Sequence, residues 1–218
     1  MKKPQRIYQV YHSLLKKYGK PRDFWQKWCK RQKTKKDREE IVIGAILTQR
    51  TNWRNVELVL KNLKREKILS IKGVYQSYKI NRKLLEKLIR PSGFYKQKTK
   101  RLFQLCRFIV KNYETLENFF RQDPEKCRKE LLRIYGIGPE TADSILLYAG
   151  GKPVFVIDEY TRRFVKKHHL SNKVLSKASS YDYLQQLFKK NLPRNTKIYQ
   201  DLHALIVLEG KKDNKIGQ

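Results

Sequence analysis

The chain has 218 residues, of which 51 are lysine or arginine and 20 are aspartate or glutamate, so its formal net charge at pH 7 is +31. Such a charge predicts a polyanionic partner, and nucleic acid is the commonest one. Membranes also attract basic proteins, but uncharged apolar segments such as residues 41–48 are far shorter than the roughly 20 residues that span a bilayer. The basic start, residues 1–4, lacks the apolar stretch of a secretory signal, so a cytoplasmic, nucleoid-associated protein is expected.

The three cysteines, Cys29, Cys106 and Cys127, are odd in number and widely spaced. They form neither a disulfide framework nor a CxxC pair, so reduced thiols and no metal site are expected. The hydrophobic fraction of 39% is sufficient for a real core, and a chain of this length fits one compact unit or two small lobes.

Apolar residues recur at helical spacing along almost the whole chain. The clearest stripes are Ile7, Val10, Tyr11, Leu14 and Leu15, then Val56, Val59, Leu60 and Leu63, then Leu102, Leu105, Cys106 and Ile109. Only Pro153–Ile157 has an extended pattern, and one such segment has no partner with which to form a sheet. The fold class is therefore predicted to be all-α, with roughly ten helices.

Three signals mark helix boundaries in chain order. Residues 37–40 have the form of a capping box, Pro91–Gly93 ends the preceding helix, and Asp123–Pro124 suits an N-cap followed by the first helical position. Residues 27–38 carry seven basic side chains in twelve positions. We interpret this stretch as a solvated connection, with phosphate contact as the alternative.

A glycine-containing turn follows at Tyr135–Pro139, between two expected helices. Gly136 and Gly138 permit backbone angles that other residues avoid, and Pro139 suits the first position of a helix. Such a turn aims backbone N–H groups and the positive end of a helix dipole at one point, which favours a phosphate. A tight turn with no ligand would have the same pattern, so the pattern alone leaves both interpretations open.

Four segments carry a resemblance to a known family. Residues 131–142 (LLRIYGIGPETA) and 154–163 (VFVIDEYTRR) resemble the helix-hairpin-helix and Gly/Pro…Asp signature of the endonuclease III superfamily of DNA glycosylases. Residues 45–53 (AILTQRTNW) and 88–102 (LIRPSGFYKQKTKRL) resemble two further landmarks of that superfamily. The second of these is most similar to the branch that contains the 3-methyladenine DNA glycosylase III type. The resemblance extends from about residue 22 to about residue 210.

The resemblance implies two helical lobes with the active site in the cleft between them. Residues 38–150 would form a central helical barrel that includes the hairpin, and residues 1–37 with 151–218 would form the second lobe. It also implies binding of double-stranded DNA with a damaged base, and we expect a monomer.

The same resemblance assigns roles to individual residues. The essential aspartate of the family falls on Asp158, and the DNA-gripping hairpin falls on residues 135–141. Bifunctional members have a catalytic lysine where this chain has Glu140, and a glutamate cannot form the Schiff base that strand cleavage requires. A monofunctional enzyme is therefore expected, although another lysine could substitute. The hairpin residues predicted to contact DNA are Gly136, Ile137, Gly138 and Thr141.

The chemistry expected of Asp158 follows from the bond to be broken. Cleavage of an N-glycosidic bond develops positive charge on the sugar, which a carboxylate stabilises while it orients and deprotonates the attacking water. An alkylated purine such as 3-methyladenine already carries positive charge, so one carboxylate suffices. The alternative role of Asp158 is an N-cap for a helix starting at Glu159. For Glu140, a role in the pocket competes with that of a first-turn acid that complements the helix dipole.

A flipped base requires aromatic walls, for which Trp53 is the first candidate and Trp25 the second. Either ring could instead belong to the core, and for Trp28 the core is favoured. Gln49 corresponds to a residue that contacts the gap left by flipping, or it is a polar helix end. The side chains expected to hold phosphates, or else to be ordinary solvated groups, are Arg50, Lys96, Lys98 and Lys100.

Many relatives follow a segment like residues 201–212 with four cysteines that hold an iron–sulfur cluster. Here no cysteine follows Gly210, so no cluster and no other cofactor are expected. Two alternatives stay open. One is a bifunctional glycosylase/lyase for oxidised bases, and the other is a non-catalytic helix-hairpin-helix DNA-binding protein, which would have no need of Asp158.

Overall fold

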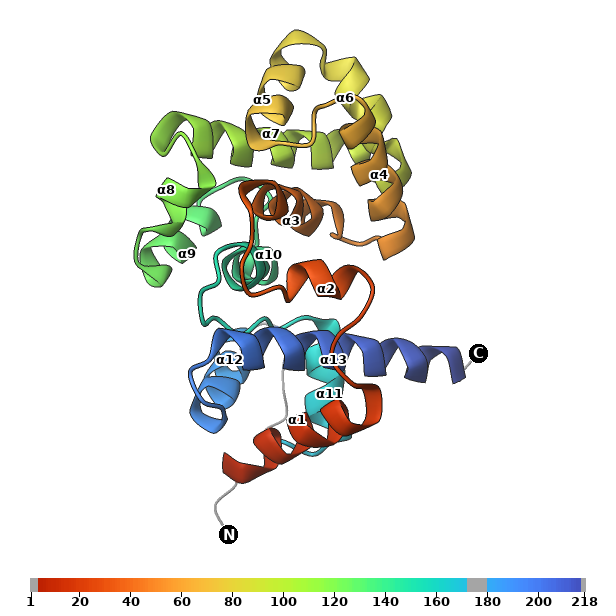
Figure 1. The fold of residues 1–218 in the computed structure, drawn as a ribbon, viewed down its shortest axis with the longest axis vertical. Coiled ribbons are helices and arrows are strands. Elements are labelled where there is room, and N and C mark those ends of the chain that lie inside the picture. The colour runs from red at the N-terminus through yellow and green to blue at the C-terminus, as the bar shows by residue number, and fades with distance from the viewer. Residues whose placement is uncertain (1–3, 172–179, 217–218) are drawn as a thin grey trace. The chain divides into compact units, whose positions relative to one another are not determined.

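The structure, a computed structural model, describes residues 4–171 and 180–216. Within these residues the chain forms thirteen α-helices, one 3-10 helix, one π-helix and no β-strand (Figure 1). The all-α prediction is confirmed. The helices outnumber the roughly ten expected because five-residue helices such as Phe24–Trp28 and Leu116–Phe120 are too short to show a periodic pattern. None of the described helices is long and apolar enough to cross a membrane.

The chain divides into two compact units: residues 1–31 with 151–218 form unit 1, and residues 32–150 form unit 2. Unit 2 contains α3 Lys35–Leu47, α4 Trp53–Arg65, α5 Ile71–Ile80, α6 Arg82–Ile89, the 3-10 helix Arg90–Ser92, α7 Tyr95–Asn112, α8 Leu116–Phe120, α9 Pro124–Leu132, α10 Pro139–Ser144 and the π-helix Ile145–Ala149. Unit 1 contains α1 Pro4–Tyr18, α2 Phe24–Trp28, α11 Glu159–Lys167, α12 Ser180–Asn191 and α13 Thr196–Ile216.

Helix α3 is the centre of unit 2. Its residues from Ile41 to Leu47 are all buried, so the second half of this helix is apolar on every side. It packs against α4, α7, α8, α10 and the π-helix. A helix that is hydrophobic all round requires such neighbours. Its end at Leu47 carries the chain into residues 48–52, which lead to α4.

The start of α3 corrects one sequence prediction. The capping box is formed by Thr34 and Asp37, since the Thr34 hydroxyl accepts from the Asp37 N–H at 3.2 Å and Asp37 accepts from the Thr34 N–H at 3.0 Å. The box was predicted to begin at Asp37, three residues too late. The second half of the basic stretch 27–38 is consequently helical. The cap at Asp123 with Pro124 in the first helical position, and the helix end before Gly93, are confirmed.

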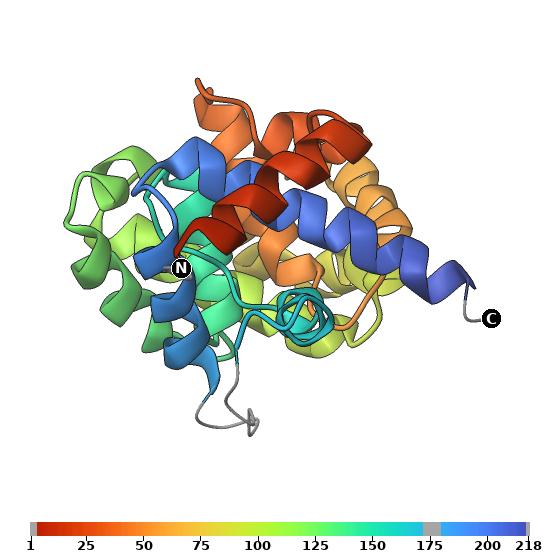
Figure 2. The same ribbon diagram turned by 90° about the horizontal axis from the view of Figure 1, so that it is seen from below.

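Unit 1 combines helices from the N-terminal and C-terminal parts of the chain. Helix α1 packs against α12 and α13, and α11 packs against α13 (Figures 1 and 2). The middle of α13 is buried on all sides from Tyr199 to Val207. The middle of this helix therefore belongs to the core of unit 1.

An irregular segment, residues 151–157, leads into α11. Its residues Val154–Ile157 are buried, so their backbone polar groups need partners. Side chains supply them: Gln185 donates to the Phe155 carbonyl at 2.9 Å, and the Thr161 hydroxyl donates to the Val156 carbonyl at 3.4 Å. The extended character predicted for this stretch is thus accommodated without a sheet.

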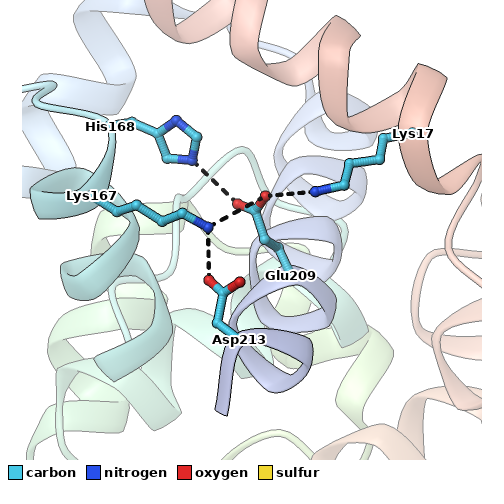
Figure 3. Close-up of polar contacts among 5 residues, drawn as sticks. All are labelled: Lys17, Lys167, His168, Glu209 and Asp213. Atoms are coloured by element: carbon cyan, nitrogen blue, oxygen red, sulfur yellow. Dashed lines mark hydrogen bonds and ion pairs between the residues drawn. The ribbon is translucent and has the colours of Figure 1, made fainter. Parts of the chain in front are cut away.

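A charge cluster made of Lys17, Lys167, His168, Glu209 and Asp213 joins α1, α11 and α13 (Figure 3). The Glu209 side chain is only 6% exposed, and its carboxylate lies 3.5 Å from Lys17 Nζ, 3.9 Å from Lys167 Nζ and 3.2 Å from His168 Nε2. The ammonium group of Lys167 also lies 2.8 Å from the Asp213 carboxylate. We refer to these five residues as the Glu209 cluster.

Candidate active site

Asp158 is the N-cap of α11, directly after the buried segment. Its Oδ1 accepts a hydrogen bond from the Thr161 N–H at 2.7 Å. Its Oδ2 lies 3.5 Å from Nε2 of His203 on α13, and the Asp158 side chain is 13% exposed. The capping role considered for Asp158 is therefore real, but it occupies one carboxylate oxygen and leaves the other facing His203.

The pKa of the Asp158 carboxyl reflects two opposed effects. Burial raises it, because a low-dielectric environment disfavours the charged form. The charge of His203, followed by the hydrogen bonds from Thr161, lowers it and outweighs the effect of burial. The net pKa lies below the ordinary value for aspartate, so Asp158 is ionised at neutral pH.

Aromatic rings contact His203, the residue that faces the Asp158 carboxylate. The His203 ring meets the edge of the Trp25 ring at a centroid distance of 6.0 Å, and Trp25 in turn contacts Phe24 at 4.5 Å and Trp28 at 5.8 Å. Trp25, the second candidate for the base pocket, thus contacts His203, which in turn contacts Asp158. Both rings are buried, at 5% exposure for Trp25 and 6% for Trp28, which agrees with the core position expected for Trp28 and with the core alternative for Trp25.

The glycine-containing turn in unit 2 connects α9 to α10. Gly136 has a φ of +81°, a conformation that favours glycine, whereas Gly138 has an ordinary φ of −91° and is the N-cap of α10. The expectation that both glycines adopt unusual angles is therefore right for Gly136 and wrong for Gly138. Pro139 begins α10, as predicted.

Gln49 holds this turn in place. Its Nε2 donates to the Gly136 carbonyl at 3.1 Å and to the Thr141 hydroxyl at 3.0 Å. Its Oε1 accepts from the Arg101 guanidinium at 2.5 Å, and Arg101 also lies against Gly136. The side-chain amide of Gln49 is thus engaged within the protein, so contact with a gap in DNA would require it to release these bonds.

Replacing Gly136 by alanine is expected to destabilise the protein by about 1–3 kcal/mol, the usual cost of a strained backbone angle. A Cβ at this position would also lie 2.4–2.6 Å from side-chain atoms of Arg101. Gly138→Ala is the matched control, because a Cβ there meets nothing within 4 Å. Urea denaturation of both variants measures the difference. Equal loss of stability in the two variants would contradict this account of the turn.

Lys98 is a correction to the sequence analysis. It was predicted to hold a phosphate, but it is 1% exposed and its ammonium group donates to the carbonyls of Leu47 at 2.9 Å and Ser92 at 2.6 Å. Burial, followed by the charge of Arg101, lowers its pKa to about 8. Lys98 therefore joins the end of α3 to the turn before α7, and its amine does not reach solvent.

The other predicted residues of unit 2 have varied environments. Arg50 is exposed at a φ of +51°, and Lys96 is exposed in the first turn of α7. Glu140 is exposed in the first turn of α10, as a dipole-complementing acid would be. Ile137 is buried at 5% exposure beneath the turn. Trp53 is half-buried in the first position of α4, and its role in a base pocket stays a prediction.

Three residues with a place in these sites were missed by the sequence analysis. His203 and Arg101 act through tertiary contacts, with Asp158 and with Gln49 respectively. Phe94 is 59% exposed at a φ of +45°, directly before α7. Its exposure and its left-handed backbone are properties of the structure, which no local sequence pattern indicates.

Metal ligation receives no support from the described residues, which contain no group of three or more histidine, cysteine, aspartate or glutamate side chains arranged to hold an ion. Cys106 and Cys127 are buried in unit 2, and Cys29 belongs to unit 1. The cysteines present therefore do not fit a four-cysteine iron–sulfur cluster.

Solved structures share this fold. The 3-methyladenine DNA glycosylase (MagIII) of H. pylori, crystallised with 1,N6-ethenoadenine, is 31% identical with a TM-score of 0.76, and the match covers 98% of this chain and 99% of that one. A trapped covalent complex of endonuclease III with DNA has a TM-score of 0.71 at 18% identity, covering 97% of this chain and 88% of that one. At that identity, the likeness concerns the fold alone.

Sequence comparisons extend the match. The curated protein "Putative DNA repair glycosylase MJ1434" of Methanocaldococcus jannaschii is 42% identical over 208 residues, 94% of this chain and 87% of that protein. Endonuclease III of Thermotoga maritima is 26% identical over 163 residues, 71% of this chain and 65% of that protein. Residues 43–194 match the HhH-GPD superfamily of base excision DNA repair proteins. The resemblance inferred from the motifs is thus confirmed, and the chain belongs to this superfamily of DNA repair glycosylases.

Proposed function

We propose that the protein is a monofunctional DNA glycosylase that hydrolyses the N-glycosidic bond of an alkylated purine such as 3-methyladenine. The observation that carries this proposal is Asp158, an ionised carboxylate at the position of the essential aspartate, beside His203 and an aromatic cluster. A similar solved protein, the H. pylori 3-methyladenine DNA glycosylase at 31% identity, supports the choice of substrate class.

The reaction requires little more than this carboxylate. As the bond between C1′ and the base nitrogen breaks, its electron pair goes to the purine and neutralises the positive charge of an alkylated ring. Positive charge develops on the sugar, which Asp158 stabilises, and water attacks C1′ while its proton passes to the carboxylate. The departing base is already activated, so no strong general acid is needed.

A flipped base needs a wall on which to stack. The cluster of Phe24, Trp25 and Trp28 provides aromatic rings next to His203, and a cationic purine gains roughly 0.5–2 kcal/mol on a tryptophan face. Trp25 contacts His203 but is only 5% exposed, so a flipped base would reach its face only after local movement, and half-buried Trp53 stays the first candidate.

Unit 2 supplies groups suited to duplex DNA. Tyr135, in the glycine-containing turn, is 55% exposed with Lys100 Nζ 4.8 Å over its ring. Arg50 and Lys96 are exposed and basic, as phosphate contacts require. Phe94 is an exposed apolar side chain suited to filling the gap left by a flipped base, since the amide of Gln49 is engaged with the turn. The protein is proposed to act as a monomer on damaged double-stranded DNA.

Glu140 makes hydrolysis the favoured route. Strand cleavage proceeds through a Schiff base on an amine, and a carboxylate at this position cannot form one. The proposal includes no iron–sulfur cluster, because the chain has three cysteines, two buried in unit 2 and one in unit 1, where a cluster needs four together. Analysis of purified protein for iron and sulfide tests this element of the proposal.

Incubation with duplexes that carry either alkylated purines or oxidised bases, followed by identification of the released bases, tests the substrate class. The proposal expects free alkylated purine from the first substrate. Release of oxidised bases alone would overturn the substrate class, and tight binding with no release from either duplex would indicate a non-catalytic DNA-binding protein.

A further inference from the structure

We infer that His203 is a positioning residue that keeps the Asp158 carboxylate ionised and oriented for base excision, an inference that rests on the proposed glycosylase function. The two side chains come from different helices of unit 1, and their contact joins the N-terminus of α11 to the buried middle of α13.

The geometry holds the carboxylate from two directions. Thr161 donates its backbone N–H to Oδ1 at 2.7 Å, and the His203 imidazole approaches Oδ2 at 3.5 Å. Both side chains are largely removed from solvent, at 6% exposure for His203 and 13% for Asp158. Because both of its oxygens are contacted, the carboxylate has a fixed orientation, as activation of an attacking water requires.

The His203 ring is itself held by packing. It meets the Trp25 ring at 80° and 6.0 Å and the Phe155 ring at 83° and 6.4 Å. Its neighbours on α13, Leu202 and Ala204, are fully buried. The imidazole is thus pre-organised beside Asp158, as a supporting group of a precise site must be.

The other titratable groups near His203 and Asp158 face other residues or have smaller effects on the Asp158 carboxyl. On α13, the Asp201 carboxyl faces the Tyr11 hydroxyl of α1. From α12, the Tyr181 hydroxyl approaches the Ile157 N–H at 3.5 Å, next to Asp158, and α2 presents Trp25, which carries no charge. Among the described residues, His203 is the group that most strongly opposes the effect of burial on the Asp158 carboxyl.

The functional consequence follows from the competition between burial and charge. A carboxyl group in a nearly dry site tends toward its neutral form, which neither stabilises a positive sugar nor accepts a proton from water. His203 offsets this tendency, and the pKa of Asp158 lies below its ordinary value. Without the imidazole, only the hydrogen bonds from Thr161 would oppose burial, and the pKa of Asp158 would rise.

The test is the pH profile of single-turnover base release by His203→Gln. We expect its acidic limb to move up by about 1–3 pH units, the usual size of a one-charge effect on a carboxyl group. The plateau at higher pH should be retained, because Asp158 is ionised there in both proteins. His12→Gln is the matched control: it removes an exposed histidine on α1 and should leave the profile unchanged.

A second measurement covers the case in which His203→Gln does not fold. The carboxyl carbon of Asp158, followed by NMR in the wild-type protein, should titrate below the ordinary range for aspartate. An unshifted acidic limb in folded His203→Gln, or wild-type titration at or above the ordinary value, overturns the inference. A wild type that releases no base overturns the proposed function instead, so the two failures are distinguishable.

Discussion

Replacing Asp158 by asparagine is expected to reduce base release by at least about 100-fold, the scale of a lost acid–base group. Asparagine has nearly the same shape and is an equally good N-cap, so the bond from the Thr161 N–H is retained. The change removes the charge proposed to stabilise the sugar, together with the ion pair to His203. Single-turnover base release measures the effect, and fluorescence anisotropy with the same duplex checks that DNA binding persists.

Glu159→Gln is the control for this experiment, because it removes the same charge from the adjacent, exposed residue of α11. It should release base at nearly the wild-type rate. Undiminished release by Asp158→Asn would falsify the assigned mechanism. An equal loss in both variants would show that the effect belongs to the net charge of the helix start.

The largest expected effect on stability is that of Glu209→Gln. This change leaves Lys17, Lys167 and His168 around a neutral amide in a nearly buried position. Breaking a buried charge pair costs about 3–5 kcal/mol, and we expect about 2–4 kcal/mol here because the lysines are partly exposed. Denaturant unfolding of the wild type and the variant measures the difference.

The Glu209 cluster contains its own control. Asp213, on the same helix as Glu209, pairs with Lys167 at 2.8 Å, but the Asp213 side chain is 47% exposed. Asp213→Asn should therefore cost less than about 1 kcal/mol, and salt should reduce this cost. Similar losses for the two variants, both removed by salt, would mean that Glu209 acts only as a surface ion pair.

The helical fold was predictable because the apolar stripes are strong. Extending one stripe also shows why Lys98 is buried rather than a phosphate contact. The stripe of Leu102, Leu105, Cys106 and Ile109 continues backward by one turn to Thr99 and Lys98, both of which are buried. Position 98 thus lay on the core face of α7. The abundance of exposed lysines in this chain concealed that signal.

Asp158 and the glycine-containing turn were predictable because motifs mark them within a few consecutive residues. Gln49 was also selected, but its bonds to Gly136 and Arg101 span 87 and 52 positions, and no local pattern encodes such contacts. His203 had a weaker signal. It is a polar residue within an otherwise apolar stretch of α13, but its partner Asp158 is named only by the tertiary structure.

The central claim is base removal by water without strand cleavage. The most direct measurement follows an end-labelled duplex with one alkylated purine and monitors free base, strand integrity and covalent trapping by borohydride in the same reaction. We predict release of the base, an intact abasic strand and no trapped complex. A borohydride-trapped complex formed together with strand cleavage would contradict the account, because it would require another lysine of the chain to supply the amine that Glu140 lacks.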